Sequence, residues 1–372
     1  MKKLGFGAMR LPLTDAADQT AVDMEQVCQM VDSFLEQGFT YVDTAYMYHN
    51  YASEKILRKA LVERHPRDSY TIATKLPTMM LKEPEDQPRI FNEQMDKLGV
   101  DYFDYYLLHC LNQENYAIAQ RLDSFGFVSQ MKKEGKVRKM GFSFHDSAEL
   151  LDQILTEHPE VEFVQLQLNY LDWDSVSVQS RRCQEVCVRH GKPIVVMEPV
   201  KGGTLAKVPA AAEALMKAAE PDMSVASWAV RYAASQENVF MVLSGMSDLG
   251  QMMDNTSYMR DFQPLTADET AMLRQVTKII QEDMQVPCTA CRYCTEGCPK
   301  QIAIPDYFAL YNQSLKEGRP SDDTLSKYRD FQQEQGKGKA SDCIACRQCE
   351  RHCPQHIHIV DQLKAVARQL EV

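Results

Sequence analysis

The sequence predicts a closed (β/α)8 barrel followed by a small, mainly α-helical domain. Short β-branched or aromatic segments alternate with longer helical patterns as far as about residue 258. Eight such strand–helix pairs in one chain are typical of a TIM barrel. Beyond that point the strand pattern stops, and cysteines gather in two runs. We therefore expect residues 1–262 to form the barrel and residues 263–372 to form the helical domain.

The strand candidates recur at intervals of roughly thirty residues, as βα units do. The helix candidates between them carry apolar residues at i, i+3 and i+4; Val27, Met30, Val31 and Phe34 form one such stripe. A doubly wound sheet is the competing fold, but Gly5-x-Gly7 lacks the third glycine of a nucleotide-binding loop. The eight candidates are Leu4–Ala8, Thr40–Asp43, Tyr70–Lys75, Phe103–His109, Val137–Ser143, Glu162–Gln167, Ile194–Glu198 and Val239–Ser244.

After the barrel, three helices are expected. Thr266-x-x-Glu269 has the form of a capping box and opens a helix that runs to about Met284. Two more helical stretches, Asp306–Lys316 and Asp322–Gln335, separate the cysteine runs.

The two cysteine runs share the spacing C-x2-C-x2-C-x3-C-P, which is that of bacterial ferredoxins with cubane 4Fe–4S clusters. They begin at Cys288 and Cys343. In such proteins the fourth cysteine of each run binds the other cluster. The spacing thus predicts one cluster on Cys288, Cys291, Cys294 and Cys353, and a second on Cys343, Cys346, Cys349 and Cys298. Structural zinc and disulfides are the alternatives, and neither needs a fourth cysteine at that place.

Composition limits the class of protein. The chain is 44% hydrophobic and 25% charged, as globular proteins are. Its formal net charge of −11 argues against a nucleic-acid or anionic-membrane partner. No apolar stretch is long enough for a membrane helix or a signal peptide. Since eight of the twelve cysteines lie in the two runs, we expect metal binding in the reducing cytoplasm.

Four polar residues fall at or just after the ends of predicted strands, where barrels place their chemistry. Asp43 ends the second strand, and Tyr48 lies in the loop that follows. Lys75 and His109 end the third and fourth strands. A single residue of this kind is often only solvated, but four at one rim predict a catalytic site.

The barrel segment resembles the aldo/keto reductase family. The resemblance rests on Asp43-Thr-Ala-Tyr-Met-Tyr48, Ala73-Thr-Lys75, Asp101-Tyr-Phe-Asp-Tyr-Tyr-Leu-Leu-His109, Gly141-Phe-Ser143 and Met197-Glu-Pro-Val-Lys-Gly-Gly203. It implies that Tyr48 is the general acid of carbonyl reduction and that Lys75 lowers its pKa from about 10. It also implies that Asp43 holds Lys75 and that His109 orients the carbonyl oxygen.

The same resemblance implies a nicotinamide dinucleotide at the ends of strands five to eight. Ser143 and Gln165 would contact the carboxamide, and Glu198, Lys201, Gly202 and Gly203 would approach the pyrophosphate. Ser244, Gly245, Gln251 and Asn255 would face the adenosine. Because this last segment has no Lys or Arg before Arg260, NADP and NAD both remain open.

Three functions fit these motifs. The first is NAD(P)H-dependent reduction of an aldehyde, ketone or quinone, with the cluster domain structural or electron-supplying. The second is electron transfer in which the clusters feed a flavin bound in the barrel, or a substrate, and the dinucleotide is dispensable, since nicotinamide handles one-electron steps poorly. A redox partner protein is a candidate partner. The third is a redox-sensing or binding module with a vestigial catalytic site.

Overall fold

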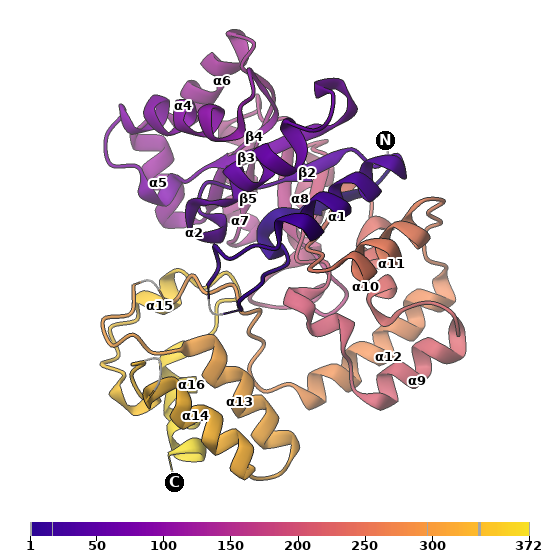
Figure 1. Ribbon diagram of the computed structural model, residues 1–372, viewed down its shortest axis with the longest axis vertical. Helices are drawn as coiled ribbons and strands as arrows, with labels where there is room; N and C mark the ends of the chain where they lie inside the picture. The colour runs from indigo at the N-terminus through magenta and orange to yellow at the C-terminus, as the bar shows by residue number, and fades with distance from the viewer. Residues whose placement is uncertain (1, 17, 296, 334–335, 372) are drawn as a thin grey trace. The chain divides into compact units, whose positions relative to one another are not determined.

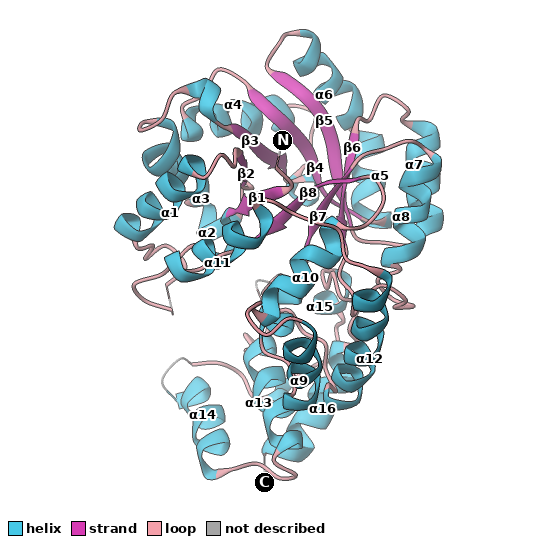
Figure 2. Cartoon of the chain, turned by 90° about the vertical axis from the view of Figure 1, so that its right-hand side faces the viewer, coloured by secondary structure: helices cyan, strands magenta, loops and turns pink. Residues whose placement is uncertain are grey.

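A computed structural model describes residues 2–16, 18–295, 297–333 and 336–371. Its eight parallel strands close into a barrel in chain order, as predicted, with β1 hydrogen-bonded to both β2 and β8. Figure 2 shows these strands with helices on their outer side. The strands are β1 (Leu4–Gly7), β2 (Tyr41–Asp43), β3 (Thr71–Leu76), β4 (Phe103–Leu111), β5 (Val137–Phe144), β6 (Phe163–Gln167), β7 (Ile194–Met197) and β8 (Val239–Ser244).

The helices alternate with the strands, and Figure 1 follows them along the chain. Those of the barrel region are α1 (Met24–Glu36), α2 (Tyr48–Tyr51), α3 (Ser53–Leu57), α4 (Asp86–Leu98), α5 (Gln113–Arg121), α6 (Ser124–Lys133), α7 (Ala148–Glu157), α8 (Ser180–Arg189), α9 (Ala210–Ala219), α10 (Val225–Ala234) and α11 (Leu249–Met259). The C-terminal helices are α12 (Ala267–Asp283), α13 (Ile304–Lys316), α14 (Asp322–Gln333), α15 (Gln348–Arg351) and α16 (Ile359–Leu370). The last two residues of the helix expected over Asp322–Gln335 lie outside the described residues.

Large side chains fill the barrel interior, so it is a packed core and not a pore. Tyr41, Leu107, Phe163 and Met241 come from alternate strands and are almost fully buried. Because side chains fill the barrel interior, the polar side chains of the strands lie at the carboxyl rim, where the loops begin.

Five strands end at residues other than those expected. β1 and β7 end one residue early, β5 ends one residue late, and the differences in β3 and β4 lie at predicted catalytic residues. β3 continues one residue beyond Lys75, and β4 runs past His109 to Leu111. The register between β4 and β5 shifts between Leu108 and Leu111, and Cys110 has a left-handed φ of 60°. This irregularity interrupts the regular alternation of side chains just at His109.

The chain divides into two compact units that interleave in sequence. One holds residues 1–175, 179–200 and 226–270; the other holds residues 176–178, 201–225 and 271–372. The loop after β7 and helix α9 therefore belong to the same unit as the cysteine runs. The predicted boundary between the barrel and the helical domain, at residues 262/263, stays a prediction.

The cysteine-containing unit has its own core. Tyr307 and Phe308 of α13 pack with Leu363 and Val366 of α16, and α14 adds Tyr328. Among the described residues, no helix has the length and apolar character needed to cross a membrane.

Candidate functional site

Asp43 and Lys75 form a buried ion pair at the carboxyl ends of β2 and β3. Their exposures are 3% and 1%. Lys75 Nζ donates to Asp43 Oδ1 at 2.6 Å and to the backbone oxygen of Thr44 at 2.7 Å. Burial lowers the pKa of Lys75 and raises the pKa of Asp43, and the attraction between the two charges opposes both shifts. The short hydrogen bond favours the charged pair, which holds an ammonium group at a fixed place.

Tyr48 and His109 lie beside this pair, so the structure brings all four predicted catalytic residues together. Lys75 Nζ is 5.1 Å from the centre of the Tyr48 ring, and the ring centres of Tyr48 and His109 are 6.1 Å apart. Burial lowers the pKa of His109 well below its usual 6.5, and Lys75 and His145 lower it further. His109 is therefore neutral at physiological pH.

Tyr48 is carried by a turn with unusual backbone geometry. The next three residues, His49, Asn50 and Tyr51, have left-handed φ values of 51°, 49° and 68°. His49 holds this turn: its Nε2 accepts from the Leu11 amide at 3.3 Å, and its Nδ1 lies 2.8 Å from the carbonyl oxygen of Gln19. Because Nε2 must accept there, the proton belongs on Nδ1. Sequence patterns did not indicate His49, since its partners are backbone groups far along the chain.

A buried polar network lies behind Lys75 and was also missed. Glu54, with 0% exposure, accepts hydrogen bonds from Thr74 Oγ1 at 2.8 Å and Gln94 Nε2 at 2.7 Å. Gln94 also donates to the backbone oxygen of Lys75 at 3.1 Å and accepts from Tyr106 at 2.7 Å. This network fixes the end of β3. Polar residues inside the apolar faces of α3 and α4 were the available sign of it.

Ser143 and Gln165, the predicted carboxamide contacts, lie next to the catalytic residues. They are direct neighbours in the register of β5 and β6. Ser143 Oγ accepts from the Cys110 amide at 2.7 Å, and Gln165 Nε2 approaches Asp43 Oδ2 at 3.4 Å. Both side chains are almost fully buried. The structure thus gathers them at the same rim as Asp43.

Ser244, at the end of β8, and Asn255 of α11 were predicted to contact the nucleotide, and they are hydrogen-bonded to each other. Asn255 Nδ2 donates to Ser244 Oγ at 2.7 Å. Gln251 is exposed, and its side chain accepts from the Ser247 amide at 2.9 Å. Gly245 lies against Arg10, since a Cβ atom at Gly245 would be 3.4 Å from the Arg10 side chain. Because β1 pairs with β8, Arg10, which follows β1, adds a positive charge to this segment. The segment has no Lys or Arg of its own before Arg260.

The predicted pyrophosphate loop is divided between the two compact units. Glu198, with a left-handed φ of 55°, belongs to the barrel unit, whereas Lys201, Gly202 and Gly203 belong to the unit with the cysteines. Lys201 is 2% exposed, and its Nζ donates to Gln355 Oε1 at 3.0 Å. The four residues lie within six consecutive positions, and the contact of this loop with a pyrophosphate stays a prediction.

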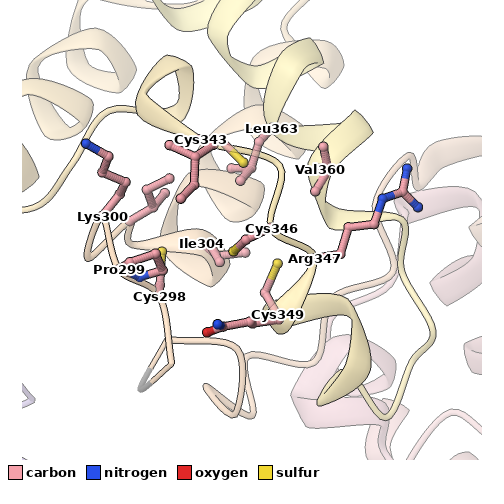
Figure 3. Close-up of a pocket in the computed structure, with 13 residues that line it drawn as sticks. Cys298, Pro299, Lys300, Ile304, Cys343, Cys346, Arg347, Cys349, Val360 and Leu363 are labelled. Atoms are coloured by element: carbon pink, nitrogen blue, oxygen red, sulfur yellow. The ribbon is translucent and has the colours of Figure 1, made fainter.

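The eight cysteines of the two runs line two pockets. We call the one lined by Cys288, Cys291, Cys294 and Cys353 the first cysteine pocket. The second cysteine pocket is lined by Cys298, Cys343, Cys346 and Cys349. Each pocket thus takes three cysteines from one run and one from the other, the grouping that the spacing predicted. Figure 3 shows the four sulfurs of the second pocket around a common space.

The donor set and the size of each pocket fit an iron–sulfur cluster. Among the described residues, no three Cys, His, Asp or Glu side chains converge tightly enough to hold a single metal ion. Four cysteines in each pocket, three from one run and one from the other, match a pair of cubane clusters better than structural zinc. Apolar residues line part of each pocket, and Ile304 is shared by both. Burial raises the pKa of the Cys349 thiol to about 12, so a cation is needed to hold it as a thiolate.

Known proteins share these features. The profile of the aldo/keto reductase family matches residues 3–278, and that of the 4Fe–4S dicluster domain matches residues 287–358. An uncharacterized oxidoreductase of Schizosaccharomyces pombe, C215.11c, is 26% identical over 68% of this chain and 80% of its own length. An aldo-keto reductase of Mycolicibacterium vanbaalenii is 29% identical over 66% of this chain and 81% of its own.

Solved structures show the same fold. The aldo-keto reductase AKR11C1 from Bacillus halodurans, in its holo form, superimposes with a TM-score of 0.59 at 23% identity, covering 74% of this chain and 91% of that one. An aldo-keto reductase from Klebsiella pneumoniae in complex with NADPH gives 0.57 at 19% identity, covering 74% and 90%. Since the family profile spans most of the sequence, the chain belongs to the aldo/keto reductase family of oxidoreductases and carries a 4Fe–4S dicluster domain after its barrel.

Proposed function

We propose that the protein reduces the carbonyl group of an aldehyde, ketone or quinone at the carboxyl rim of the barrel, with Tyr48 as the general acid. The observation that carries this proposal is the position of Lys75. Its ammonium is held by Asp43 at 2.6 Å and lies 5.1 Å from the centre of the Tyr48 ring. A fixed positive charge favours the phenolate that remains after the proton has left Tyr48.

Reduction of a carbonyl adds a hydride to carbon and a proton to oxygen. A bound dihydronicotinamide supplies the hydride. Tyr48 supplies the proton to the oxygen, and the Lys75 ammonium balances the resulting charge. Neutral His109 donates one hydrogen bond to the same oxygen. Its buried Nδ1 has no hydrogen-bond partner among the described residues, so we place the proton on Nε2, because an unpaired acceptor is tolerated better than an unpaired N–H.

The nucleotide is NADP or NAD, bound along the ends of β5 to β8. Ser143 and Gln165 lie beside the catalytic residues and would hold the carboxamide. The Klebsiella pneumoniae relative is a complex with NADPH. Here Arg10, packed against Gly245, offers the positive charge that a 2′-phosphate needs.

The C-terminal domain binds two 4Fe–4S clusters, one in each cysteine pocket. The crossed grouping of Cys353 and Cys298 supports this part of the proposal. Iron and sulfide analysis of anaerobically purified protein should find about eight iron atoms in each chain.

Tyr48→Phe is the direct test of the catalytic proposal. This variant lacks only the phenolic proton, so we expect carbonyl reduction to fall at least about 100-fold. Nucleotide binding, followed by fluorescence titration, should stay unchanged. Tyr46→Phe is the matched control because the Tyr46 hydroxyl is bound to Glu93 at 2.9 Å. Near-normal turnover by Tyr48→Phe would refute the assignment.

A second candidate function is electron transfer, with clusters that pass electrons to or from the barrel. It is favoured by the exposure of the second cysteine pocket, where Cys346 is exposed and Ile344 is 58% exposed. Because this pocket is open to solvent, a redox partner protein could dock next to its cluster. Absorbance spectra before and after addition of NADPH under anaerobic conditions separate the two candidates. Bleaching of the clusters, with a flavin band, supports electron transfer; unchanged clusters with carbonyl turnover support two parallel modules.

A further inference from the structure

Lys201 is a buried lysine in a strained turn after β7. It has a left-handed φ of 48°, and only 2% of its surface is exposed. Lysine is almost never fully buried unless its ammonium is bound. Here Nζ donates to Gln355 Oε1 at 3.0 Å. The lysine and its partner both belong to the unit that carries the cysteines.

The turn forms part of the wall of the first cysteine pocket. Gln355 and Thr289 both line that pocket, and they follow Cys353 and Cys288 closely in the sequence. Gly202, with a φ of 62°, lies so close to Thr289 that an added Cβ atom would be 2.4 Å from the Thr289 carbonyl oxygen. The backbone on one side and the Lys201 side chain on the other therefore attach this turn to the pocket.

Lys201, beside the first pocket, is buried, whereas Arg292 at the first pocket and Lys300 and Arg347 at the second are exposed to water. At the first pocket, Arg292 is neutralised by Asp306 at 2.7 and 3.0 Å. At the second pocket, Lys300 and Arg347 are exposed, and Figure 3 shows their side chains directed to opposite sides. Water weakens the effect of exposed charges, whereas a buried charge acts through a medium of lower dielectric constant.

A cluster held by four thiolates carries net negative charge, and one-electron reduction adds one more. Nearby positive charge stabilises the reduced form, and net charge and hydrogen bonding are known to set cluster potentials. We infer that Lys201, acting through Gln355 in the pocket wall, raises the reduction potential of the cluster in the first pocket relative to the cluster in the second. This role is an alternative to the pyrophosphate contact expected of Lys201, and it rests on the proposed two-cluster content.

The test is an anaerobic redox titration of the full-length, cluster-loaded protein, followed by electron paramagnetic resonance. In Lys201→Met, one of the two midpoint potentials should become more negative. At a fixed potential, the ratio of reduced to oxidised cluster should fall at least about tenfold. For a one-electron couple this corresponds to a shift of about 59 mV in the midpoint potential. The other midpoint should stay in place, so the second cluster serves as an internal reference.

Three further variants complete the test. Lys201→Arg keeps the positive charge and should keep the wild-type potential. Lys207→Met removes an exposed lysine from the same loop and should change neither potential. If Lys201→Met does not retain its iron, Gln355→Glu adds a negative charge at the same place and should move the same midpoint to more negative values.

Three results would overturn the inference. Equal shifts of both midpoints would show a general effect on the domain. Potentials unchanged in Lys201→Met, with weaker nucleotide binding, would return Lys201 to the pyrophosphate. Equal shifts in Lys201→Met and Lys201→Arg would show that packing and not charge matters. Failure of the two-cluster proposal is distinguishable, because wild-type protein would then contain far fewer than about eight irons.

Discussion

The catalytic rim and the cysteine pockets organise polar groups in opposite ways. At the rim, the ligands of Lys75 are protein groups: the carboxylate of Asp43 and the carbonyl of Thr44. In the pockets, the cysteines lie on loops and on the short helix α15, with apolar residues around them. At the rim, protein groups bind the charged ends of Asp43 and Lys75, whereas the thiols of the pockets need a metal group that the chain does not supply.

Backbone strain occurs in both regions, but it is held differently. Near the rim, His49, Asn50 and Tyr51 have left-handed φ values, and the buried His49 holds their turn through hydrogen bonds to Leu11 and Gln19. Six non-glycine residues in and near the cysteine runs adopt left-handed φ values between 49° and 65°: Ala290, Arg292, Gln301, Ala345, Arg347 and His356. Each such residue costs roughly 1–2 kcal/mol. Metal binding can offset this cost, since the binding energy of a structural metal site is also folding energy. We therefore expect the rim to be preorganised by the fold and the cysteine unit to depend on the proposed clusters.

The largest expected effect comes from removal of the clusters. Chelation under anaerobic conditions should unfold the region around residues 287–358, because the strained cysteine loops lose the groups that hold them. The barrel core should remain folded. Limited proteolysis before and after chelation measures this, with cleavage confined to the cysteine unit. Reconstitution with iron and sulfide should restore protection. A cysteine unit that resists protease without iron would break the comparison.

A smaller effect is expected from the buried ion pair of the rim. Asp43→Asn or Lys75→Met alone leaves one buried charge without its partner, which typically costs about 3–5 kcal/mol of unfolding free energy. The double variant removes both charges and should recover most of that loss. Carbonyl reduction should stay low in all three proteins, because the double variant restores stability without the ammonium beside Tyr48.

Chemical denaturation of the barrel, monitored alongside turnover, provides both readouts. Lys97→Met is a suitable control, since its partner Glu93 is 39% exposed and water can solvate the carboxylate that remains. Equal stability of the double variant and the weaker single variant would mean that the two charges are not coupled.

Sequence periodicity predicted the barrel because each βα unit repeats the same local pattern. The rim residues could be predicted for a related reason: Asp43 and Lys75 end neighbouring parallel strands, so topology alone brings them together. The grouping of cysteines also followed from spacing, since three thiols within a few residues can reach one cluster face while the fourth cannot.

What could not be predicted depends on packing between distant segments. His49 binds backbone groups of Leu11 and Gln19, and neither contact leaves a local pattern. Lys201 was expected at the nucleotide because its neighbours match a family motif. The structure shows its turn packed on Thr289 and Gln355, within the unit that carries the cysteines, and its contact with a nucleotide stays a prediction. Sequence similarity records which residues are present, but not which distant segments they contact.

The smallest expected effect concerns Glu54, in the buried polar network behind Lys75, and shows whether its carboxyl group is charged. Burial raises the pKa of Glu54 above its usual 4.5, and its Oε2 has no hydrogen-bond partner among the described residues. A carboxyl whose pKa is raised by folding contributes stability that is present below its ordinary pKa and lost as pH rises through the folded value. Glu54→Gln keeps the shape but cannot ionise, so it escapes that loss.

Wild type should therefore lose stability relative to Glu54→Gln as pH rises from 5 to 8, by at most about 1.4 kcal/mol per pH unit. Thermal unfolding of both proteins across this range measures the difference, and Glu25→Gln, at an exposed site of α1, should show none. A difference that stays constant with pH would mean that Glu54 is ionised throughout. Glu54 would then support the ammonium of Lys75 with a permanent negative charge, and the rim would depend on two carboxylates instead of one.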